Sequence, residues 1–574
     1  MQKRWVLNDH DPALAQSLSE RHHISPLIAA ILVNRSVTED LAIERFLKPS
    51  LIHLPEPEEM SDMKIAVERL VKAIRQGEKI TIYGDYDVDG TTATVLLVTF
   101  LQDVGAQVDY YIPHRIKEGY SLNVEALKKI KAGGTKVLVT VDNGISAVLE
   151  AKAARDMGLD LIITDHHEVP PELPQALAIL NPKKQNDHFP GKELAGVGVA
   201  FYLVIGLRKA LREAGMLGDV EPNLRQSLDL VAVGTIADMA PLVGINRILV
   251  KEGLKVLSRN PRLGLRALQE VAGVDGEVSS DQVGFRLGPR INAVGRLEEA
   301  NLGVELLLTN DLQKAETLAK RLDQANIERQ GLEDDIVQEA LAMIEAQGLH
   351  LKYRSLVVAN EKWHPGVVGI VASRLVEKYY LPAIVLARED QGLKGSARSI
   401  RNFHLVDALR ECSEHLKRFG GHRYAAGLSM DRDCLVPFVE RFDSIVRQKL
   451  TEEDFIPSLK LEVESDLSSI DAELLQQLEK LEPFGLGNPE PILLLRGVPV
   501  RESRVVGEKH LRLKVGEGRK PIGAIGFRLA QKIPAVSSRV DLAFSPGWNE
   551  WNGSKNIQLR IVDLREENVN AMRN

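Results

Sequence analysis

The stretch that decides the fold is residues 79–90, which read KITIYGDYDVDG. The first five residues are mostly β-branched or aromatic and predict a strand. The next seven predict a tight turn, because Gly84 and Gly90 allow backbone angles that other residues avoid. Carboxylates occupy alternate positions of that turn, at Asp85, Asp87 and Asp89. At least two of them can face one point, and anions held that close together need a cation.

Strand-like runs alternate with amphipathic stretches through the following hundred residues. The runs are VDYYI (108–112), KVLVTV (136–141), LDLIIT (159–164) and LAIL (177–180). This alternation predicts a doubly wound α/β domain with a parallel sheet. Further polar clusters come directly after two of the runs, DNG at 142–144 and DHHE at 165–168. Open parallel sheets bind ligands at the carboxyl ends of their strands, so we expect the clusters to converge there.

A metal site is the favoured interpretation of these clusters. The candidates are the three carboxylates of the first loop together with Asp142, Asp165, His166, His167 and, after an apolar helical stretch, Asp238. Taken singly, each could be a helix cap or a hydrogen-bonded polar residue, and Asp89 could cap the next helix. Oxygen and imidazole donors without a thiolate suit Mg²⁺ or Mn²⁺ better than zinc, and histidine favours Mn²⁺. Two such ions can support an in-line displacement at phosphorus.

The motifs resemble those of the DHH phosphoesterase superfamily. The DxD loop, Asp142 and the tripeptide Asp165-His166-His167 carry the resemblance, and FGGHRYAAG (419–427) is similar to the accessory DHHA1 domain. Four further segments resemble a bacterial branch of this superfamily that digests single-stranded DNA: LAGVGVAFYL (194–203), GPRINAVGRL (288–297), WHPGVVGIVASRL (363–375) and LKGSARSI (393–400).

The resemblance implies a site with two ions, Mn²⁺ or Mg²⁺. Asp87 and Asp142 would help hold one ion. The other would be held by Asp89, Asp142, His166 and Asp238, so that Asp142 bridges. Asp85 would be a ligand or a supporting group. The superfamily's small-nucleotide branches have a histidine four residues before the first Asp of DxD, where this chain has Tyr83, and Asp85 would be its substitute. His167 would lie beside the scissile phosphate as proton donor or charge stabiliser, or would support a ligand.

Cationic and glycine-rich segments within the recognised motifs are candidates for holding the 5′ phosphate. They are Arg115, Arg290, Arg296, Ser396, Arg398, Gly421 and His422. Arginine forks suit phosphate, and the glycines allow close backbone approach. Taken singly, each arginine could instead form a surface ion pair, and His422 could be a buried structural histidine.

The sequence predicts five segments and an α/β fold class. They are a helical lead-in (1–50), a parallel-sheet DHH catalytic domain (51–305), a long connecting helix (306–348), a smaller α/β DHHA1 substrate-binding domain (349–450) and an OB-type barrel that binds nucleic acid (451–574). The connecting helix is expected from dense Leu, Ala and charged spacing without proline. Short strands between Gly, Pro and Asn turns predict the barrel.

The C-terminal segment concentrates basic charge. Between residues 491 and 540 it holds eleven Lys or Arg against three Glu, although the whole chain of 574 residues has a net charge of -7. Aromatic residues lie within or just past this stretch, at Phe527, Phe544, Trp548 and Trp551. Basic strands with available aromatics are typical of a barrel that binds a single strand by phosphate contact and base stacking. Alternatively the aromatics fill the core, which we expect for Phe527 and Phe544.

Composition excludes several further classes of protein. Only two cysteines occur, Cys412 and Cys434, and no run of 18 apolar residues is present. These features predict a cytoplasmic protein without a disulfide framework or a membrane contact. The chain has no GxxxxGK[ST] segment, which disfavours an ATP-driven helicase.

We therefore expect a metal-dependent, processive 5′ to 3′ exonuclease. By resemblance it would degrade single-stranded DNA to 5′ mononucleotides in DNA repair and recombination, as a monomer with single-strand-binding protein and a RecQ-type helicase as partners. One alternative is a phosphodiesterase acting on cyclic dinucleotides or very short oligonucleotides. Another is a replication-fork scaffold that has lost its metals, although retention of Asp87, Asp89, Asp142, His166 and Asp238 speaks against it.

Overall fold

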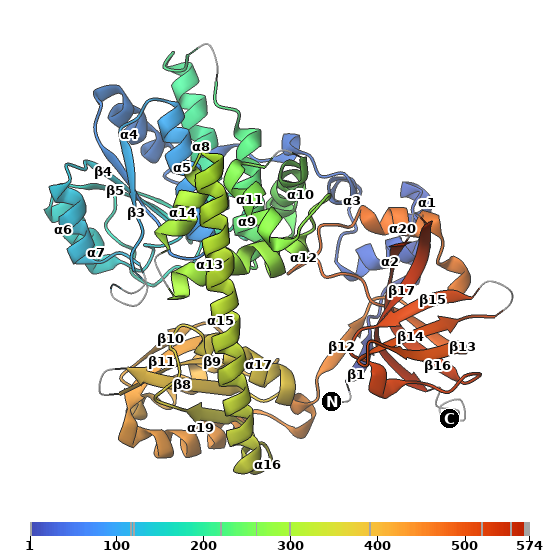
Figure 1. The fold of residues 1–574 in the computed structure, drawn as a ribbon. Coiled ribbons are helices and arrows are strands. Elements are labelled where there is room, and N and C mark those ends of the chain that lie inside the picture. Colours follow the sequence, from blue (N-terminus) through green and yellow to red (C-terminus); the bar gives the residue numbers. More distant parts are fainter. Residues whose placement is uncertain are drawn as a thin grey trace.

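The computed structural model describes residues 3–114, 118, 121–218, 221–259, 261–297, 300–389, 392–517, 521–551 and 554–566. Figure 1 shows an α/β domain, a smaller α/β domain joined to it by the long helix α15 (Leu312–Ala346), and a β-barrel beside them. The predicted fold class is confirmed. Among the described helices, none has the length and apolar character needed to cross a membrane.

The larger α/β domain is built on a parallel sheet with the strand order β3-β2-β4-β5-β6. Its strands are β2 (Ile80–Tyr83), β3 (Val108–Tyr111), β4 (Val137–Val141), β5 (Asp160–Thr164) and β6 (Ala178–Leu180). Every residue of β2 and β4 is buried, because helices cover both faces of the sheet. The carboxyl ends of all five strands lie at the same edge.

Helices form the rest of this domain. They are α4 (Met63–Gln76), α5 (Val88–Asp103), α6 (Val124–Ala132), α7 (Val148–Asp156), α8 (Gly196–Glu213), α9 (Leu228–Ala237), α10 (Gly244–Arg259), α11 (Leu263–Ala272), α13 (Gly288–Leu297) and α14 (Asn301–Leu308). A short turn of helix, α12 (Ser280–Gln282), and the π-helical turn η4 (Val283–Leu287) precede α13. Helix α5 is buried along nearly its whole length because it packs against both α8 and α9.

The connecting helix is shorter at its start than the predicted 306–348. Residues 301–308 form the separate helix α14, and α15 begins at Leu312, where the side chain of Asp311 accepts a hydrogen bond from the backbone N–H of Lys314 at 3.0 Å. That N-cap explains the break, because it satisfies a backbone donor that a continuous helix would pair internally. A short helix, α16 (Leu349–Lys352), follows α15.

The smaller α/β domain has a mixed sheet with the order β10-β11-β9-β8-β7. Its strands are β7 (Leu356–Ala359), β8 (Ala383–Glu389), β9 (Gly392–Arg398), β10 (Arg418–Gly421) and β11 (Ala425–Asp431), and its helices are α17 (Val368–Tyr379), α18 (Leu405–Arg410) and α19 (Leu435–Lys449). Only β7 and β8 pair in parallel; the other neighbours are antiparallel. Separate apolar clusters lie on the two faces of this sheet.

The C-terminal strands close into a barrel with the order β13-β14-β15-β17-β16. They are β13 (Leu493–Val506), β14 (His510–Val515), β15 (Ile522–Gly526), β16 (Arg539–Trp551) and β17 (Ser554–Glu566), preceded by α20 (Ala472–Glu479). Phe544 is fully buried in the core, as predicted. Phe527 is 59% exposed, so its predicted place in the core is wrong. It lies on the turn after β15, where its ring packs edge-on against His510.

The N-terminal segment belongs to the barrel domain. Strand β1 (Arg4–Leu7) pairs in parallel with β12 (Ser458–Leu461), and α1 (Pro12–His22), α2 (Pro26–Asn34) and α3 (Asp40–Leu47) follow it. Leu18, Ile31 and Leu32 are fully buried in one apolar cluster with the barrel core. The predicted lead-in is therefore a built-in part of the C-terminal domain (Figure 1).

A buried arginine joins the barrel domain to the larger α/β domain. The guanidinium group of Arg247, on α10, donates to the carbonyl oxygens of Phe46, Lys480 and Leu481 at 2.8–3.1 Å. It also stacks on the Phe46 ring at 4.0 Å. Burial lowers the pKa of Arg247 to about 9. The contact holds α10, the N-terminal segment and the loop after α20 in one arrangement.

Candidate metal centre

The loop after β2 places the carboxylates of Asp87 and Asp89 by two different means. Asp87 caps α5, because its side chain accepts a hydrogen bond from Gly90 N–H at 3.0 Å. Asp89 accepts from the backbone N–H groups of Gly196 and Val197 at 2.6 and 2.8 Å, at the start of α8. The capping alternative for Asp89 is therefore wrong for α5. A Cβ atom at Gly90 would lie 2.6 Å from the Asp85 backbone, which explains the glycine.

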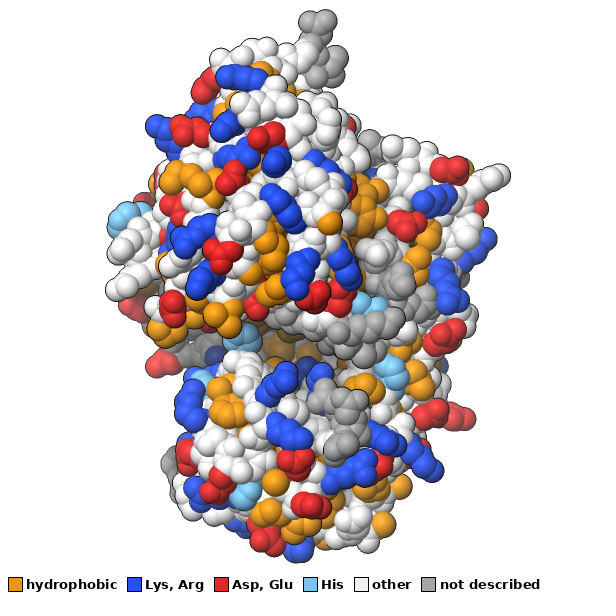
Figure 2. All heavy atoms as spheres, turned by 90° about the vertical axis from the view of Figure 1, so that its left-hand side faces the viewer, with side chains coloured by type: hydrophobic (Ala, Val, Ile, Leu, Met, Phe, Trp, Pro, Cys, Tyr) orange, Lys and Arg blue, Asp and Glu red, His pale blue; other side chains and the backbone are white. Residues whose placement is uncertain are grey.

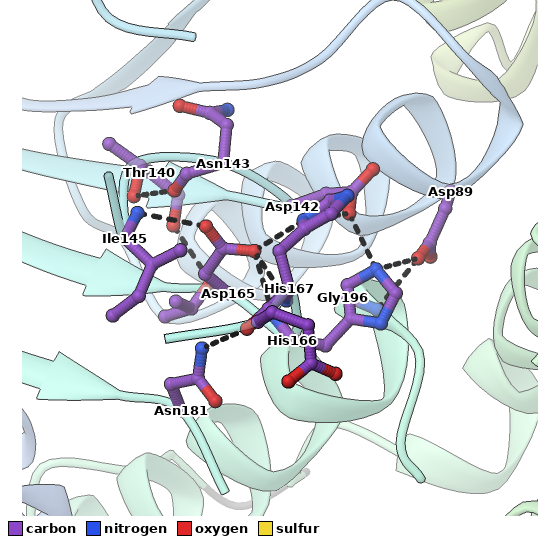
Figure 3. Close-up of polar contacts among 12 residues, drawn as sticks. Asp89, Thr140, Asp142, Asn143, Ile145, Asp165, His166, His167, Asn181 and Gly196 are labelled. Atoms are coloured by element: carbon purple, nitrogen blue, oxygen red, sulfur yellow. Dashed lines mark hydrogen bonds and ion pairs between the residues drawn. The ribbon is translucent and has the colours of Figure 1, made fainter. Parts of the chain in front are cut away.

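Asp142 and the histidine pair converge with Asp89 of this loop (Figure 3), and Asp238 joins them from the end of α9. Asp142 follows β4 in a left-handed backbone conformation, with φ 61°. The Nε2 atom of His166, after β5, lies 3.1 Å from Asp142, 3.7 Å from Asp238 and 3.9 Å from Asp89. Helix α8 approaches so closely that a Cβ atom at Gly196 would be 2.7 Å from that of Asp142. Four separate elements thus deliver ligand groups to one buried point.

Asp165 orients the histidines, and its own carboxylate is fully engaged. It accepts hydrogen bonds from the backbone N–H groups of Ile145, His166 and His167 at 2.9, 2.7 and 3.1 Å. It also lies 2.7 Å from His167 Nδ1. Burial alone would raise the pKa of Asp165, but the hydrogen bond and charge of His167 outweigh it and lower that pKa. Burial alone would lower the pKa of His167, but the hydrogen bond and charge of Asp165 raise it to about 9.

The remaining carboxylates repel one another. Burial, followed by the charges of Asp89 and Asp87, raises the pKa of Asp142 well above its usual value. Burial and the Asp87 charge raise that of Asp89 to about 7, and burial with the Asp89 charge raises that of Asp238 to about 8. Burial, helped by the charge of His167, lowers the pKa of His166 to about 3, so its ring is neutral. Buried carboxylates around a neutral imidazole suit divalent cations, because a cation removes the repulsion.

Ligand atoms fall into three overlapping groups, each within 4.8 Å. The groups are Asp85 with Asp87 and Asp142, Asp142 with His166 and His167, and Asp89 with His166 and Asp238. Asp142 and His166 are each shared between two groups. This sharing gives room for two neighbouring ions and agrees with the donor set expected for Mn²⁺ or Mg²⁺.

Tyr83 is turned away from this site. Its hydroxyl donates to the carbonyl oxygen of Ser121 at 3.0 Å and accepts from the Asn123 side chain at 3.3 Å. Its ring packs in the apolar cluster on the opposite side of the sheet from α5. The phenol is therefore no ligand, whereas the buried Asp85 lies in the group with Asp87 and Asp142.

Figure 2 shows a hollow between the larger α/β domain and the smaller one, which contains the DHHA1-like segments. Ser396 and Arg398 lie on β9, and a Cβ atom at Gly369 of α17 would be 3.2 and 3.0 Å from their side chains. Gly421, with φ 143°, allows β10 to approach β11. His422 is exposed, so the buried alternative is wrong. The pKa of Glu168, next to His167, is lowered chiefly by the hydrogen bond from Lys183 and also by His422, so His422 faces the side of the metal centre.

The candidate arginines of the larger domain also contact other elements. Arg290 forms an ion pair with Asp323 of α15 at 2.8 Å, which favours the structural alternative for this residue. Arg296 donates to the carbonyl oxygen of Gly366, in the smaller domain, at 3.1 Å. Arg115 lies outside the described residues.

One strand end was not identified as functional from the sequence. After β6, Asn181 donates to the carbonyl oxygen of His167 at 3.0 Å, and Lys183 donates to Glu168 at 2.9 Å. The segment NPKK (181–184) directly follows the predicted run LAIL. The rule that ligands bind at the carboxyl ends of parallel strands would have included this segment with the other polar clusters.

The matches to known families cover most of the chain and define it as a DHH-type phosphoesterase. Residues 79–235 match the DHH family N-terminal domain, 352–448 the DHHA1 domain, and 461–563 the RecJ OB domain. The chain belongs to the RecJ family of single-stranded-DNA-specific exonucleases.

Two relatives and two solved structures document this membership. The RecJ exonuclease of Bacillus subtilis is 43% identical over 98% of this chain and 70% of its own length. That of Escherichia coli is 38% identical over 94% and 96%. RecJ from Thermus thermophilus in complex with Mn²⁺ has a TM-score of 0.85 at 33% identity, covering 98% of this chain and 79% of that one. Its Mg²⁺ complex has a TM-score of 0.78 at 31% identity, covering 98% and 78%.

Proposed function

We propose that this single-stranded-DNA-specific exonuclease is metal-dependent and digests its strand processively from the 5′ end to 5′ mononucleotides. The observation that carries the proposal is the convergence of Asp89, Asp142, His166 and Asp238 on one buried point. Asp142 and His166 each belong to two of the groups that could hold a metal ion. We assign the metal ligands as Asp85, Asp87, Asp89, Asp142, His166 and Asp238. When bound, the ions supply activation of water and neutralisation of charge at the phosphate.

Side chains of this chain position the reacting groups. His167, fixed by Asp165, faces the carboxylate group and would hold or donate a proton beside the scissile phosphate. Asp87, Asp142, His166 and His167 form the proposed catalytic set. Across the hollow, Ser396, Arg398, Gly421 and His422 would hold the terminal phosphate, with Arg296 at the boundary between the domains. Arg290 and Arg115 remain proposed contacts by resemblance alone.

Cellular context follows the family resemblance. We propose that the chain acts as a monomer in the cytoplasm, in DNA repair and recombination. Its proposed partners are single-strand-binding protein and a RecQ-type helicase. Two free cysteines, Cys412 and Cys434, support a reducing compartment.

The direct test uses a long 5′-phosphorylated single strand with Mn²⁺ or Mg²⁺. We expect mononucleotide release that starts at the 5′ end, stops in EDTA and returns with either ion. A matched blunt duplex should stay intact. Failure to release nucleotides with either ion, digestion from the 3′ end, or equal attack on the duplex would each contradict the proposal. Activity on dinucleotides alone would point to a small-substrate phosphodiesterase.

The barrel supplies a further prediction about strand binding. Arg504 of β13 and Arg512 of β14 are directly opposed across the sheet, and both are exposed. Like charges in that relation destabilise a sheet, so a phosphate between them would be favourable. Replacing both with alanine should weaken binding of long strands and reduce the salt slope by about 0.7, the contribution of one phosphate contact on a single strand.

Arg496→Ala is the matched control, because Arg496 is held by Glu464 at 2.9 Å. Binding measured over a range of salt concentrations should change little in this variant. Hydrolysis of dinucleotides should be unaffected in all variants. An unchanged salt slope in the double variant would reject the pair as a phosphate contact.

A further inference from the structure

Phe285 is an aromatic side chain that the fold does not use for packing. Its exposed fraction is 80%, and it lies in the middle of the π-helical turn η4. π-Helical turns are rare and occur frequently at functional sites. Its neighbours Val283 and Leu287 are fully buried, so the turn is anchored while the Phe285 ring projects from it. The ring is held out by a rigid element.

The turn lies between the barrel domain and the metal centre. Just before it, the hydroxyl of Ser280 donates to the carbonyl oxygen of Phe484, at the edge of the barrel domain, at 2.6 Å. Just after it, α13 runs to the DxD loop, where a Cβ atom at Gly295 would lie 2.6 Å from the Tyr86 carbonyl oxygen. A strand passing from the barrel to the metal centre along this surface would cross η4, the turn that carries Phe285.

A cavity of about 470 Å³ adjoins the ring. Phe285, Pro289 and Ile370 supply apolar surface to it, and Arg296, Arg329 and Arg374 supply guanidinium groups. Glu333 lies between two of these groups, 2.7 Å from Arg329 and 3.0 Å from Arg374, and Asp334 is the other carboxylate of the wall. Arg374 also pairs at 3.2 Å with Glu377, which lies outside the wall, so the lining side chains by themselves carry one more cation than anion. Cavities of this size accommodate small ligands such as a nucleotide.

We propose that Phe285 and this cavity form a binding station for one nucleotide of the single strand, on the way from the barrel to the metal centre. The base stacks on the Phe285 ring, and Arg296 and Arg374 face the adjoining phosphates. An exposed aromatic beside arginines is the combination that binds single strands without sequence preference. This inference rests on the proposed function and adds a position-specific contact to it.

The kinetic test compares Phe285→Ala with Phe285→Trp. Loss of base stacking should raise KM for long single strands about tenfold in the alanine variant, whereas tryptophan should keep KM close to that of the unaltered chain. Values of kcat, and hydrolysis of dinucleotides too short to reach the station, should be unchanged. Leu351→Ala is the matched control, because Leu351 is 82% exposed on α16, the short helix after α15. An unchanged KM in Phe285→Ala would overturn the proposal.

A spectroscopic test locates the contact on the strand. A fluorescent adenine analogue, 2-aminopurine, is placed at successive positions of a 5′-phosphorylated strand bound in EDTA. We expect quenching confined to one or two neighbouring positions, and its loss in Phe285→Ala. Uniform fluorescence, or quenching that survives the substitution, would reject the station, including the case in which Phe285 binds a protein. If the unaltered chain released no nucleotides, the proposed function would fail separately.

Discussion

Asp142→Asn is expected to abolish cleavage while leaving strand binding measurable. Asp142 is shared between two ligand groups, so its loss weakens both proposed ion sites at once. Changing a residue that only supports a metal ligand typically costs 10–100-fold in activity, so loss of a shared ligand should cost more than about 100-fold. The asparagine amide retains one oxygen but carries no charge, and asparagine tolerates the left-handed backbone at this position.

The fold should survive this substitution, which makes it a sharp test. Without metal, Asp142 is repelled by Asp85, Asp87, Asp89 and Asp238, so removing its charge relieves strain in the empty site. We expect an unfolding temperature equal to or above that of the unaltered chain, and a loss of Mn²⁺ binding measured by calorimetry. Asp156→Asn, at an exposed position on α7, is the control. Cleavage that persists in Asp142→Asn would show that another residue bridges the ions.

Leu32→Ala is expected to destabilise the barrel domain by about 2–5 kcal/mol, the usual cost of emptying a fully buried leucine site. Leu32 lies on α2, in the same apolar cluster as the barrel core. The two α/β domains have apolar clusters of their own. Loss of Leu32 should therefore affect the barrel selectively.

Two measurements distinguish destabilisation of the barrel domain alone from destabilisation that includes the catalytic domain. Thermal unfolding should show an earlier transition for the barrel domain, and long-strand binding should fall at temperatures above it. Dinucleotide hydrolysis should persist there. Leu41→Ala is the control, because Leu41 on α3 is 58% exposed. If dinucleotide hydrolysis fell together with long-strand binding, the N-terminal segment would be supporting the catalytic domain instead.

The metal centre was predictable because a parallel sheet brings its carboxyl strand ends to one edge. That rule alone joined Asp142 and His166 to the loop after β2. It could not show that Asp165 accepts four hydrogen bonds and so orients the histidines, since this depends on backbone groups of the next loop. It also could not show that Arg290 pairs with Asp323 of α15.

Contacts between distant parts of the sequence set the limit of prediction. No local pattern in RWVL (4–7) indicates that it pairs with SLKL (458–461), because strand pairing leaves no sequence signature at that separation. The prediction that Phe527 lies in the core was wrong for a related reason. An aromatic residue at the end of a barrel strand can point inward or outward, and the turn after β15 decides which.

The pairing of β1 with β12 also affects how the chain is made. Arg4 finds its partner Ser458 only after the ribosome has added about 450 further residues, which at roughly 5–20 residues per second takes about 20–90 s. During that interval the apolar faces of α1 and α2 have no barrel to cover them. This segment is therefore synthesised long before the strands that cover it, and its apolar side chains stay exposed while the two α/β domains fold.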